Sequence, residues 1–189
     1  MTNHPVAPFR PLPENLGLLV VDIQEKFRPA IPGFDEIAAK AALLVKAFTV
    51  FGMPVLATEQ YPQGLGPTVP AVASVLPAGI IPLTKKQFSC CGAPGFDETI
   101  KRTNRSALVL CGIETHVCIY QTALDLLARG LTVVLPADAL GSRKELDHAT
   151  ALRRMEQCGA IVMTVEMLLF DLLRSAENPH FKEMQKLVK

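Results

Sequence analysis

Two uninterrupted apolar runs, at residues 16–21 and 107–113, constrain the fold of this chain more than any other feature. Both are rich in branched side chains, and neither alternates apolar with polar residues. That pattern is typical of strands buried on both faces of a parallel sheet. Each run is far too short to cross a bilayer as a helix, so we expect no membrane partner.

Strands and helices alternate along the whole chain, which indicates parallel pairing with right-handed crossovers. Pro82 cannot donate to a strand ladder, so the third strand should lie at a sheet edge. The predicted strands are residues 16–22, 54–58, 80–85, 107–113, 132–136 and 160–165. Helices are predicted at 35–51, at 116–128, after a capping box at 142–145, and in the carboxyl-terminal tail.

The sequence therefore predicts one domain over residues 1–189, with residues 1–14 as an extended arm. Its fold class is α/β, a three-layer α/β/α sandwich. The sheet should be six-stranded, mostly parallel and doubly wound, with strand order 3-2-1-4-5-6.

Charge and cysteine usage narrow the classes of function. The chain has 19 basic and 18 acidic residues and no long basic run, so we expect no nucleic-acid partner. Five cysteines, an odd number set within apolar segments, favour a reducing compartment over a disulfide scaffold. The amino terminus lacks an apolar signal core. We predict a cytoplasmic protein, and the amino terminus leaves a mitochondrial address open.

Three ionisable side chains, Asp22, Lys85 and Cys118, follow or end predicted strands. In open parallel sheets ligands bind beyond the carboxyl ends of the strands, so these side chains should share one pocket. Thr115 is a good N-cap, which would place Cys118 third in its helix. The helix start and an adjacent ammonium would then lower the pKa of the thiol from its usual value near ~8.5.

Each of these residues also has a structural interpretation. A lone cysteine after a strand is more often packing than catalysis, and an aspartate at a strand end is often a turn residue. Lys86 competes with Lys85, although strand parity sends the two to opposite sides. His116 shares no helix face with Cys118 two residues later. His148 lies mid-helix, where satisfied packing is the expected role.

Four motifs occur in order along nearly the whole chain. They are LVVDIQ at 19–24, the Lys-x-x-aromatic-Ser element at 85–89, the Gly-x-x-Thr-x-x-Cys turn at 112–118, and ADA at 137–139 before the helix with His148. Together they resemble the isochorismatase-like cysteine hydrolases. The segment TEQYP, followed by GLGPT at 64–68, is most similar to the subgroup called isochorismatase domain-containing proteins.

The resemblance implies a Cys-Asp-Lys triad. Cys118 would be the nucleophile, Asp22 the base and later proton donor, and Lys85 the positioning cation. It also implies an oxyanion hole made by the backbone N–H groups of Glu114 and Cys118, with a cis peptide between Ile113 and Glu114. The implied reaction is hydrolysis of an amide-type C–N bond in a small molecule through an acyl-enzyme, without a cofactor.

The substrate pocket is less clearly marked in the sequence. Candidate substrate-binding residues are Gln24, Phe27, Gln60, Tyr61 and Cys90, although loop composition explains them equally well.

Two departures from the family limit the possible chemistry. Metal-dependent nicotinamidases carry Asp-x-His after the second strand, whereas this chain has EQY at 59–61 and no His from 5 to 115, so no metal is expected. True isochorismatases lack the nucleophilic cysteine, so Cys118 argues against their reaction.

A second hypothesis belongs to another class. The chain could be a catalytically idle oligomer that keeps the pocket and acts through its surface, but the intact triad favours an enzyme. In either case the family implies a homo-oligomer, a dimer or tetramer. The apolar side chains of Phe181, Met184 and Leu187 are candidate subunit contacts.

Overall fold

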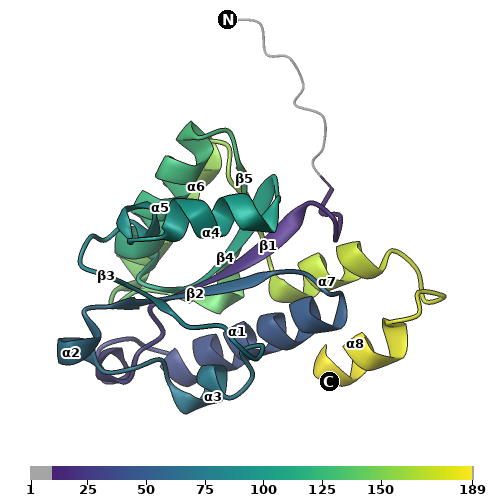
Figure 1. Cartoon of the computed structure of the whole chain (residues 1–189), viewed down its shortest axis with the longest axis horizontal. Coiled ribbons are helices and arrows are strands. Elements are labelled where there is room, and N and C mark those ends of the chain that lie inside the picture. Colours follow the sequence, from purple (N-terminus) through teal and green to yellow (C-terminus); the bar gives the residue numbers. More distant parts are fainter. Residues whose placement is uncertain (1–9, 189) are drawn as a thin grey trace, which may run out of the picture.

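The structure is a computed structural model that describes residues 10–188. A central sheet is covered by helices on both faces (Figure 1). The strands are β1 (Leu16–Val21), β2 (Val55–Gln60), β3 (Leu83–Lys85), β4 (Ala107–Ile113), β5 (Thr132–Pro136), β6 (Leu140–Gly141) and β7 (Ile161–Met163). The helices are α1 (Phe34–Val50), α2 (Pro62–Leu65), α3 (Pro70–Ala73), α4 (Phe96–Thr103), α5 (Tyr120–Ala128), α6 (Glu145–Gln157), α7 (Val165–Leu173) and α8 (Phe181–Val188).

The strand order β3-β2-β1-β4-β5-β7 confirms the predicted order, with β7 as the sixth predicted strand. All of these pairings are parallel. The prediction of six strands is wrong by one, because the two-residue strand β6 pairs with the end of β4. A two-residue strand is too short to leave a hydrophobic pattern in the sequence.

The two apolar runs, at residues 16–21 and 107–113, form the centre of the sheet. Every residue of β1 and β4 is buried, as a parallel strand between two helical layers requires. Helices α1, α3, α7 and α8 cover one face, and α4, α5 and α6 cover the other (Figure 1). The carboxyl ends of the parallel strands meet at one edge of the sheet.

Local details differ from the sequence predictions in three places. Strand β3 begins at Leu83, so Pro82 precedes the strand; β3 does lie at the sheet edge, as predicted. The capping box is wrong: α6 begins at Glu145 after Lys144, and the Ser142 hydroxyl lies 3.0 Å from Nδ1 of His116 instead. The helix predicted at 116–128 starts as a π-helical turn, Thr115–Ile119, before α5.

The apolar side chains of the carboxyl-terminal helix α8 pack against their own chain. Met184 is buried, and Phe181 and Leu187 pack half-buried against the core layer of α1. Met184 is therefore covered by its own chain and is not a subunit contact, whereas for Phe181 and Leu187 the contact stays a prediction.

The predicted arm over residues 1–14 falls largely on residues 1–9, which lie outside the described part of the chain. Its described end contains a turn in which the Asn15 N–H donates to the Leu12 carbonyl at 2.9 Å. In the described part of the chain, residues 10–188, no helix combines the length and the apolar character that crossing a membrane requires.

Gly112 allows the two central strands to approach where the site begins. It pairs with Val21 and has φ 124°, a conformation that side chains rarely adopt. A Cβ at this position would lie 2.0 Å from the Val21 carbonyl oxygen, a backbone atom that cannot swing away. Only glycine fits, which gives a physical reason for the first residue of the Gly-x-x-Thr-x-x-Cys turn.

We therefore expect Gly112→Ala to lower the free energy of unfolding by about 3 kcal/mol, through backbone strain and the clash with β1. The matched control is Gly130→Ala, where φ is 80° but nothing lies within 4 Å of the added methyl group. That change should cost only about 1 kcal/mol. Urea unfolding of both variants would measure the difference, and equal losses would contradict the role of the Val21 contact.

Candidate active site

The structure brings Asp22, Lys85 and Cys118 together at the carboxyl edge of the sheet. Asp22 follows β1, Lys85 ends β3, and Cys118 lies in the π-helical turn after β4. All three are buried. Asp22 has φ 53°, a left-handed conformation that is uncommon outside glycine and that concentrates at functional sites.

The Lys85 ammonium is held by four acceptors. Its Nζ donates to Oδ2 of Asp22 at 2.6 Å, to Oε1 of Gln60 at 2.7 Å, and to the carbonyls of Phe88 at 3.0 Å and Gln87 at 3.3 Å. Burial is the largest single effect and opposes its charge, but the charge of Asp22, the neighbouring Cys90 and Cys118, and the hydrogen bond to Asp22 together raise the pKa of Lys85. The side chain therefore stays a fixed cation rather than a proton donor.

The second oxygen of the Asp22 carboxylate is held as well. Oδ1 accepts the Thr58 hydroxyl at 2.8 Å, and that hydroxyl lies 3.6 Å from Sγ of Cys90. Cys90 is fully buried, so it lies beneath the carboxylate and not at the pocket rim. Burial and the Asp22 charge raise the pKa of Cys90 to about 11. Sequence reasoning gave Thr58 no role; its one signal is a hydroxyl at the end of a buried strand.

The surroundings of the Cys118 thiol favour its protonated form. Burial raises the pKa of Cys118 to about 12, the Asp22 carboxylate raises it further through its charge and a hydrogen bond, and Lys85 offsets only part of this. The predicted lowering of this pKa is therefore wrong in direction, because burial beside a carboxylate outweighs the helix start and the ammonium. The carboxylate beside the thiol is positioned to accept its proton.

The backbone turn before Cys118 has the predicted cis peptide between Ile113 and Glu114. Glu114, not Thr115, is the N-cap, so Cys118 is fourth in the turn rather than third. The Thr115 hydroxyl instead lies 2.9 Å from Nδ1 of His148, which confirms the structural role expected for that histidine. Burial lowers the pKa of His148, which favours its neutral form.

The predicted substrate-binding residues differ in how accessible their side chains are to a ligand. Gln24 is fully buried: its Nε2 donates to the Gln60 and Gly66 carbonyls, and its Oε1 accepts the Gln60 N–H. It therefore secures the end of β2. Gln60 contacts Lys85, and Phe27 packs against the α1 layer.

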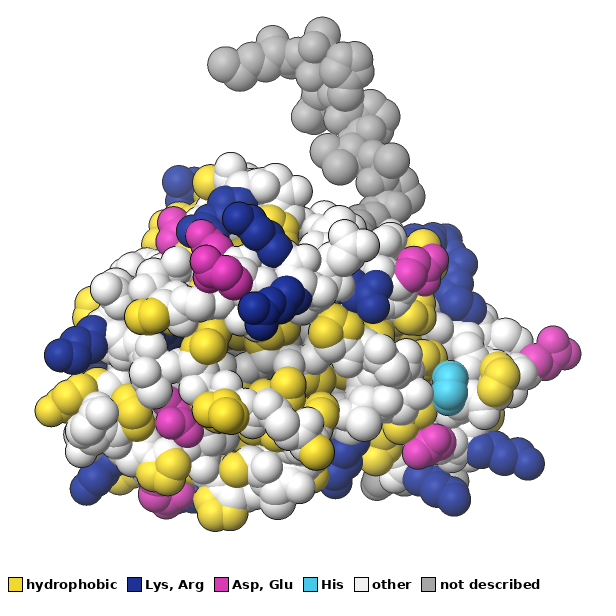
Figure 2. Space-filling model, viewed as in Figure 1, with side chains coloured by type: hydrophobic (Ala, Val, Ile, Leu, Met, Phe, Trp, Pro, Cys, Tyr) yellow, Lys and Arg dark blue, Asp and Glu magenta, His cyan; other side chains and the backbone are white. Residues whose placement is uncertain are grey.

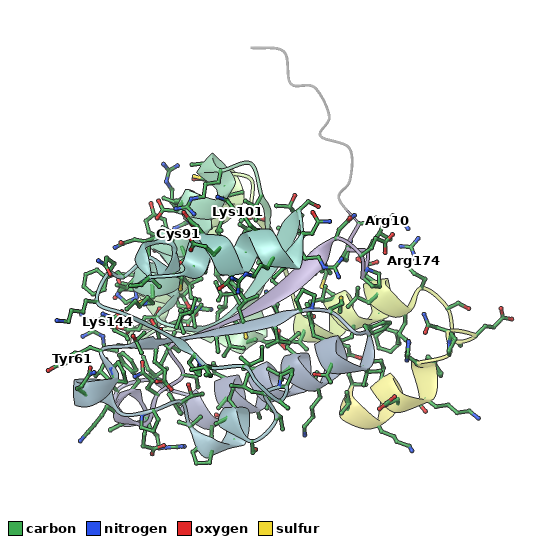
Figure 3. All side chains as sticks on the ribbon, viewed as in Figure 1. Arg10, Tyr61, Cys91, Lys101, Lys144 and Arg174 are labelled. Atoms are coloured by element: carbon green, nitrogen blue, oxygen red, sulfur yellow. The ribbon has the colours of Figure 1, made fainter. Side chains whose placement is uncertain are left out.

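Tyr61 is the most accessible of these candidates. Its side chain points outward where the strands end (Figure 3), and the residue is 49% exposed. It lines a hollow of about 310 Å³ together with Thr84, Lys86 and Gln87. Lys85 also borders this hollow, whereas Asp22 and Cys118 are not among its lining residues.

His116 is not among the residues that line that hollow. It lines a second hollow of about 450 Å³ with residues of α5 and α6, among them Tyr120, Asp147 and Arg154. Within residues 10–188, no group of three or more His, Cys, Asp or Glu side chains is arranged to hold a metal ion. The expectation of a metal-independent site stays a prediction.

The parallel sheet, with a cysteine, an aspartate and a lysine gathered at its carboxyl edge, is a three-layer α/β/α fold of the isochorismatase-like class. A family model described as Isochorismatase domain matches residues 17–167. The chain therefore belongs to the isochorismatase family, as the sequence motifs predicted.

Particular relatives confirm the predicted subgroup. Isochorismatase domain-containing protein 2A from Mus musculus is 46% identical over 181 residues, which cover 95% of this chain and 85% of the relative. A solved structure described as MAR1 ribonuclease from Caenorhabditis elegans is 41% identical, with TM-score 0.90, and covers 95% of this chain and 92% of that chain. The YcaC gene product from Escherichia coli, described as an octameric hydrolase of unknown specificity, shares the fold at 23% identity and TM-score 0.86, covering 97% of each chain.

The protonation of Cys118 generates a test. Because Asp22 raises the pKa of the thiol, Asp22→Asn should lower that pKa and speed alkylation of Cys118 by iodoacetamide at pH 8, by about tenfold for each unit of pKa. Lys85→Met should slow alkylation, because the ammonium favours the thiolate. Mass spectrometry of Cys118 against time would give both rates.

The matched control for this test is Asp97→Asn, which removes an exposed carboxylate paired with Arg129 at the surface and should leave the rate unchanged. Circular dichroism would establish that each variant is folded. Slower alkylation of folded Asp22→Asn would show that the carboxylate activates the resting thiol, contrary to the structure.

Proposed function

We propose that this chain is a metal-independent cysteine hydrolase that cleaves an amide-type C–N bond of a small molecule through an acyl-enzyme. The observation that carries the proposal is the buried cluster itself: a thiol, a carboxylate that influences its pKa, and a cation fixed 2.6 Å from that carboxylate. Such an arrangement supplies a nucleophile together with a proton acceptor beside it.

The first half of the reaction forms the acyl-enzyme. The sulfur of Cys118 attacks the carbonyl carbon while the thiol proton passes to the Asp22 carboxylate. The resulting tetrahedral oxyanion accepts hydrogen bonds from the backbone N–H groups of Glu114 and Cys118. Asp22 then gives its proton to the leaving nitrogen, the C–N bond breaks, and the amine departs.

The second half regenerates the thiol. Water attacks the thioester carbonyl and loses a proton to Asp22, and the tetrahedral intermediate collapses with cleavage of the C–S bond. Asp22 returns the proton to sulfur, and the carboxylic acid leaves. Throughout, the Lys85 ammonium compensates the charge of Asp22 when the carboxylate is ionised, since its four acceptors keep it in place.

The burial of the sulfur supports a small substrate. Cys118 is 6% exposed, and the hollow beside Lys85 measures about 310 Å³, the lower end of the range for small-molecule pockets. A long polymer would have to place one bond deep below the surface. The compartment is proposed from the sequence alone, as cytoplasmic.

RNA cleavage is the second candidate function, because a relative at 41% identity is described as a ribonuclease. The surface features of RNA binding are a basic stripe and exposed aromatic platforms. On the face shown in Figure 2, Lys and Arg side chains are scattered among acidic and apolar ones. The buried thiol and the balanced charge favour the amide reaction over this one.

Screening a library of small amides and carbamoyl compounds would test the proposal. We expect turnover by the wild type, a loss of at least about 1000-fold in kcat/KM for Cys118→Ala, and wild-type rates for the matched control Cys158→Ala. Acid quenching during turnover should trap a mass increment on Cys118.

The outcomes separate the hypotheses. Cleavage of a labelled RNA, lost in Cys118→Ala, without amide turnover would favour the ribonuclease instead. Neither activity, with Cys118 present and the protein folded, would favour the idle oligomer.

We further propose that the chain forms a homo-oligomer, a dimer or tetramer. Support comes from the octameric assembly described for YcaC and from exposed apolar side chains, Met167 and Phe170, one turn apart on α7. Sedimentation equilibrium at micromolar concentration should show a mass of at least two chains, and Phe170→Glu should shift it toward one. A monomeric wild type would remove this proposal.

A further inference from the structure

Glu114 carries a carboxylate for which the proposed reaction has no use. The residue lies between the cis peptide and the turn that holds Cys118, and its side chain is 8% exposed. A buried carboxylate is costly unless it is paired and hydrogen-bonded. Its partner therefore bears directly on how the turn is held.

Arg143 supplies two donors to a single oxygen of that carboxylate. Its backbone N–H lies 3.0 Å from Oε2 of Glu114, and its side-chain Nε lies 2.9 Å from the same atom. Arg143 comes two residues after β6, whose Gly141 pairs with Ile113 at the end of β4. We call these two hydrogen bonds from Arg143 to Glu114 the clamp. The clamp extends the β4–β6 pairing by one residue, to Glu114, which directly follows β4.

The backbone carbonyl of Glu114 is also held by hydrogen bonds. Its carbonyl accepts the N–H groups of Val117 at 3.0 Å and Ile119 at 3.2 Å, inside the π-helical turn. In contrast, its own backbone N–H donates to no acceptor among residues 10–188. Buried backbone N–H groups are nearly always paired, so a buried residue with an unused donor indicates a place for a ligand atom.

We propose that Arg143 is a positioning residue for the oxyanion hole, and that its two-donor clamp fixes the direction of the Glu114 N–H. The inference rests on the proposed hydrolase function. Arg143 acts through Glu114 and not on the substrate: its Nη1 and Nη2 atoms bond to no described residue, and its side chain is 59% exposed. The competing interpretation is that the clamp only neutralises a buried charge.

Two probes of Cys118 distinguish these interpretations. Propanal adds to the thiol to give a thiohemiacetal, so a new S–C bond forms and the carbonyl oxygen becomes negatively charged before it takes up the thiol proton. Iodoacetamide forms an S–C bond by displacing iodide and generates no oxyanion. The first reaction therefore needs the oxyanion hole, whereas the second reports only the reactivity of the thiol.

The test is Arg143→Met, which removes the Nε donor and the charge but keeps a long side chain. We expect the propanal concentration that halves alkylation of Cys118 to rise by at least about tenfold, because a misdirected donor loses most of its effect. Alkylation without propanal should change by less than about twofold. With an amide substrate, kcat should fall while KM stays nearly constant.

Arg129→Met is the matched control, because Arg129 makes an arginine–carboxylate pair with Asp97 at 2.5 Å, away from the turn. It should leave both probes unchanged. If Arg143→Met does not fold, Glu114→Gln can replace it, because it keeps an acceptor but loses the charge. This variant should also weaken propanal binding, by a smaller factor, and leave alkylation without propanal nearly unchanged. In Arg143→Ala, added guanidinium chloride at millimolar concentration should restore part of the propanal affinity.

Unchanged propanal affinity in a folded variant, or equal losses with both probes, would overturn the role of Arg143. The failure of the proposed function has a different signature. A wild type that binds propanal at Cys118, loses that affinity in Arg143→Met, and hydrolyses no amide would retain the oxyanion hole while refuting amide hydrolysis.

Discussion

The buried ion pair between Lys85 and Asp22 is the interaction on which the site depends. A cation and an anion removed from water are tolerated only when each satisfies the other and the remaining hydrogen-bonding capacity is used. Here three further acceptors surround the ammonium, and Thr58 donates to the second carboxylate oxygen. The pair therefore fixes a carboxylate of known orientation beside a thiol, and it does so with residues from three different strands.

The architecture could be predicted because it depends on patterns within short segments of the sequence. Continuous apolar runs marked the central strands, and the short links between strands and helices implied parallel order. The gathering of Asp22, Lys85 and Cys118 followed from topology, since the carboxyl ends of parallel strands share an edge. Strand β6 was not predicted because two residues are too few to show a hydrophobic period. Ser142 was wrongly predicted to cap a helix, because its hydroxyl instead lies within hydrogen-bonding distance of His116 in a distant turn.

The parts of the site that the sequence did not predict depend on packing between distant segments. Thr58 reaches Asp22 only because β2 pairs with β1 in the register that sets Val21 beside Thr58. Arg143 reaches Glu114 only because β6 adds to β4. The state of the Cys118 thiol is the clearest case, since helix position and a nearby lysine favoured ionisation, whereas burial, known only from the assembled core, reversed the outcome.

The raised pKa of Cys118 has a consequence for the life of the protein in the cell. Oxidants such as peroxides attack thiolates far faster than thiols, so a buried sulfur with a raised pKa should react with them more slowly than a resting thiolate would. Full nucleophilicity would then arise only for the moment in which a carbonyl compound occupies the crevice and the proton moves to Asp22. In the proposed hydrolase, resistance to oxidation and nucleophilic reactivity would thus belong to different moments of the catalytic cycle.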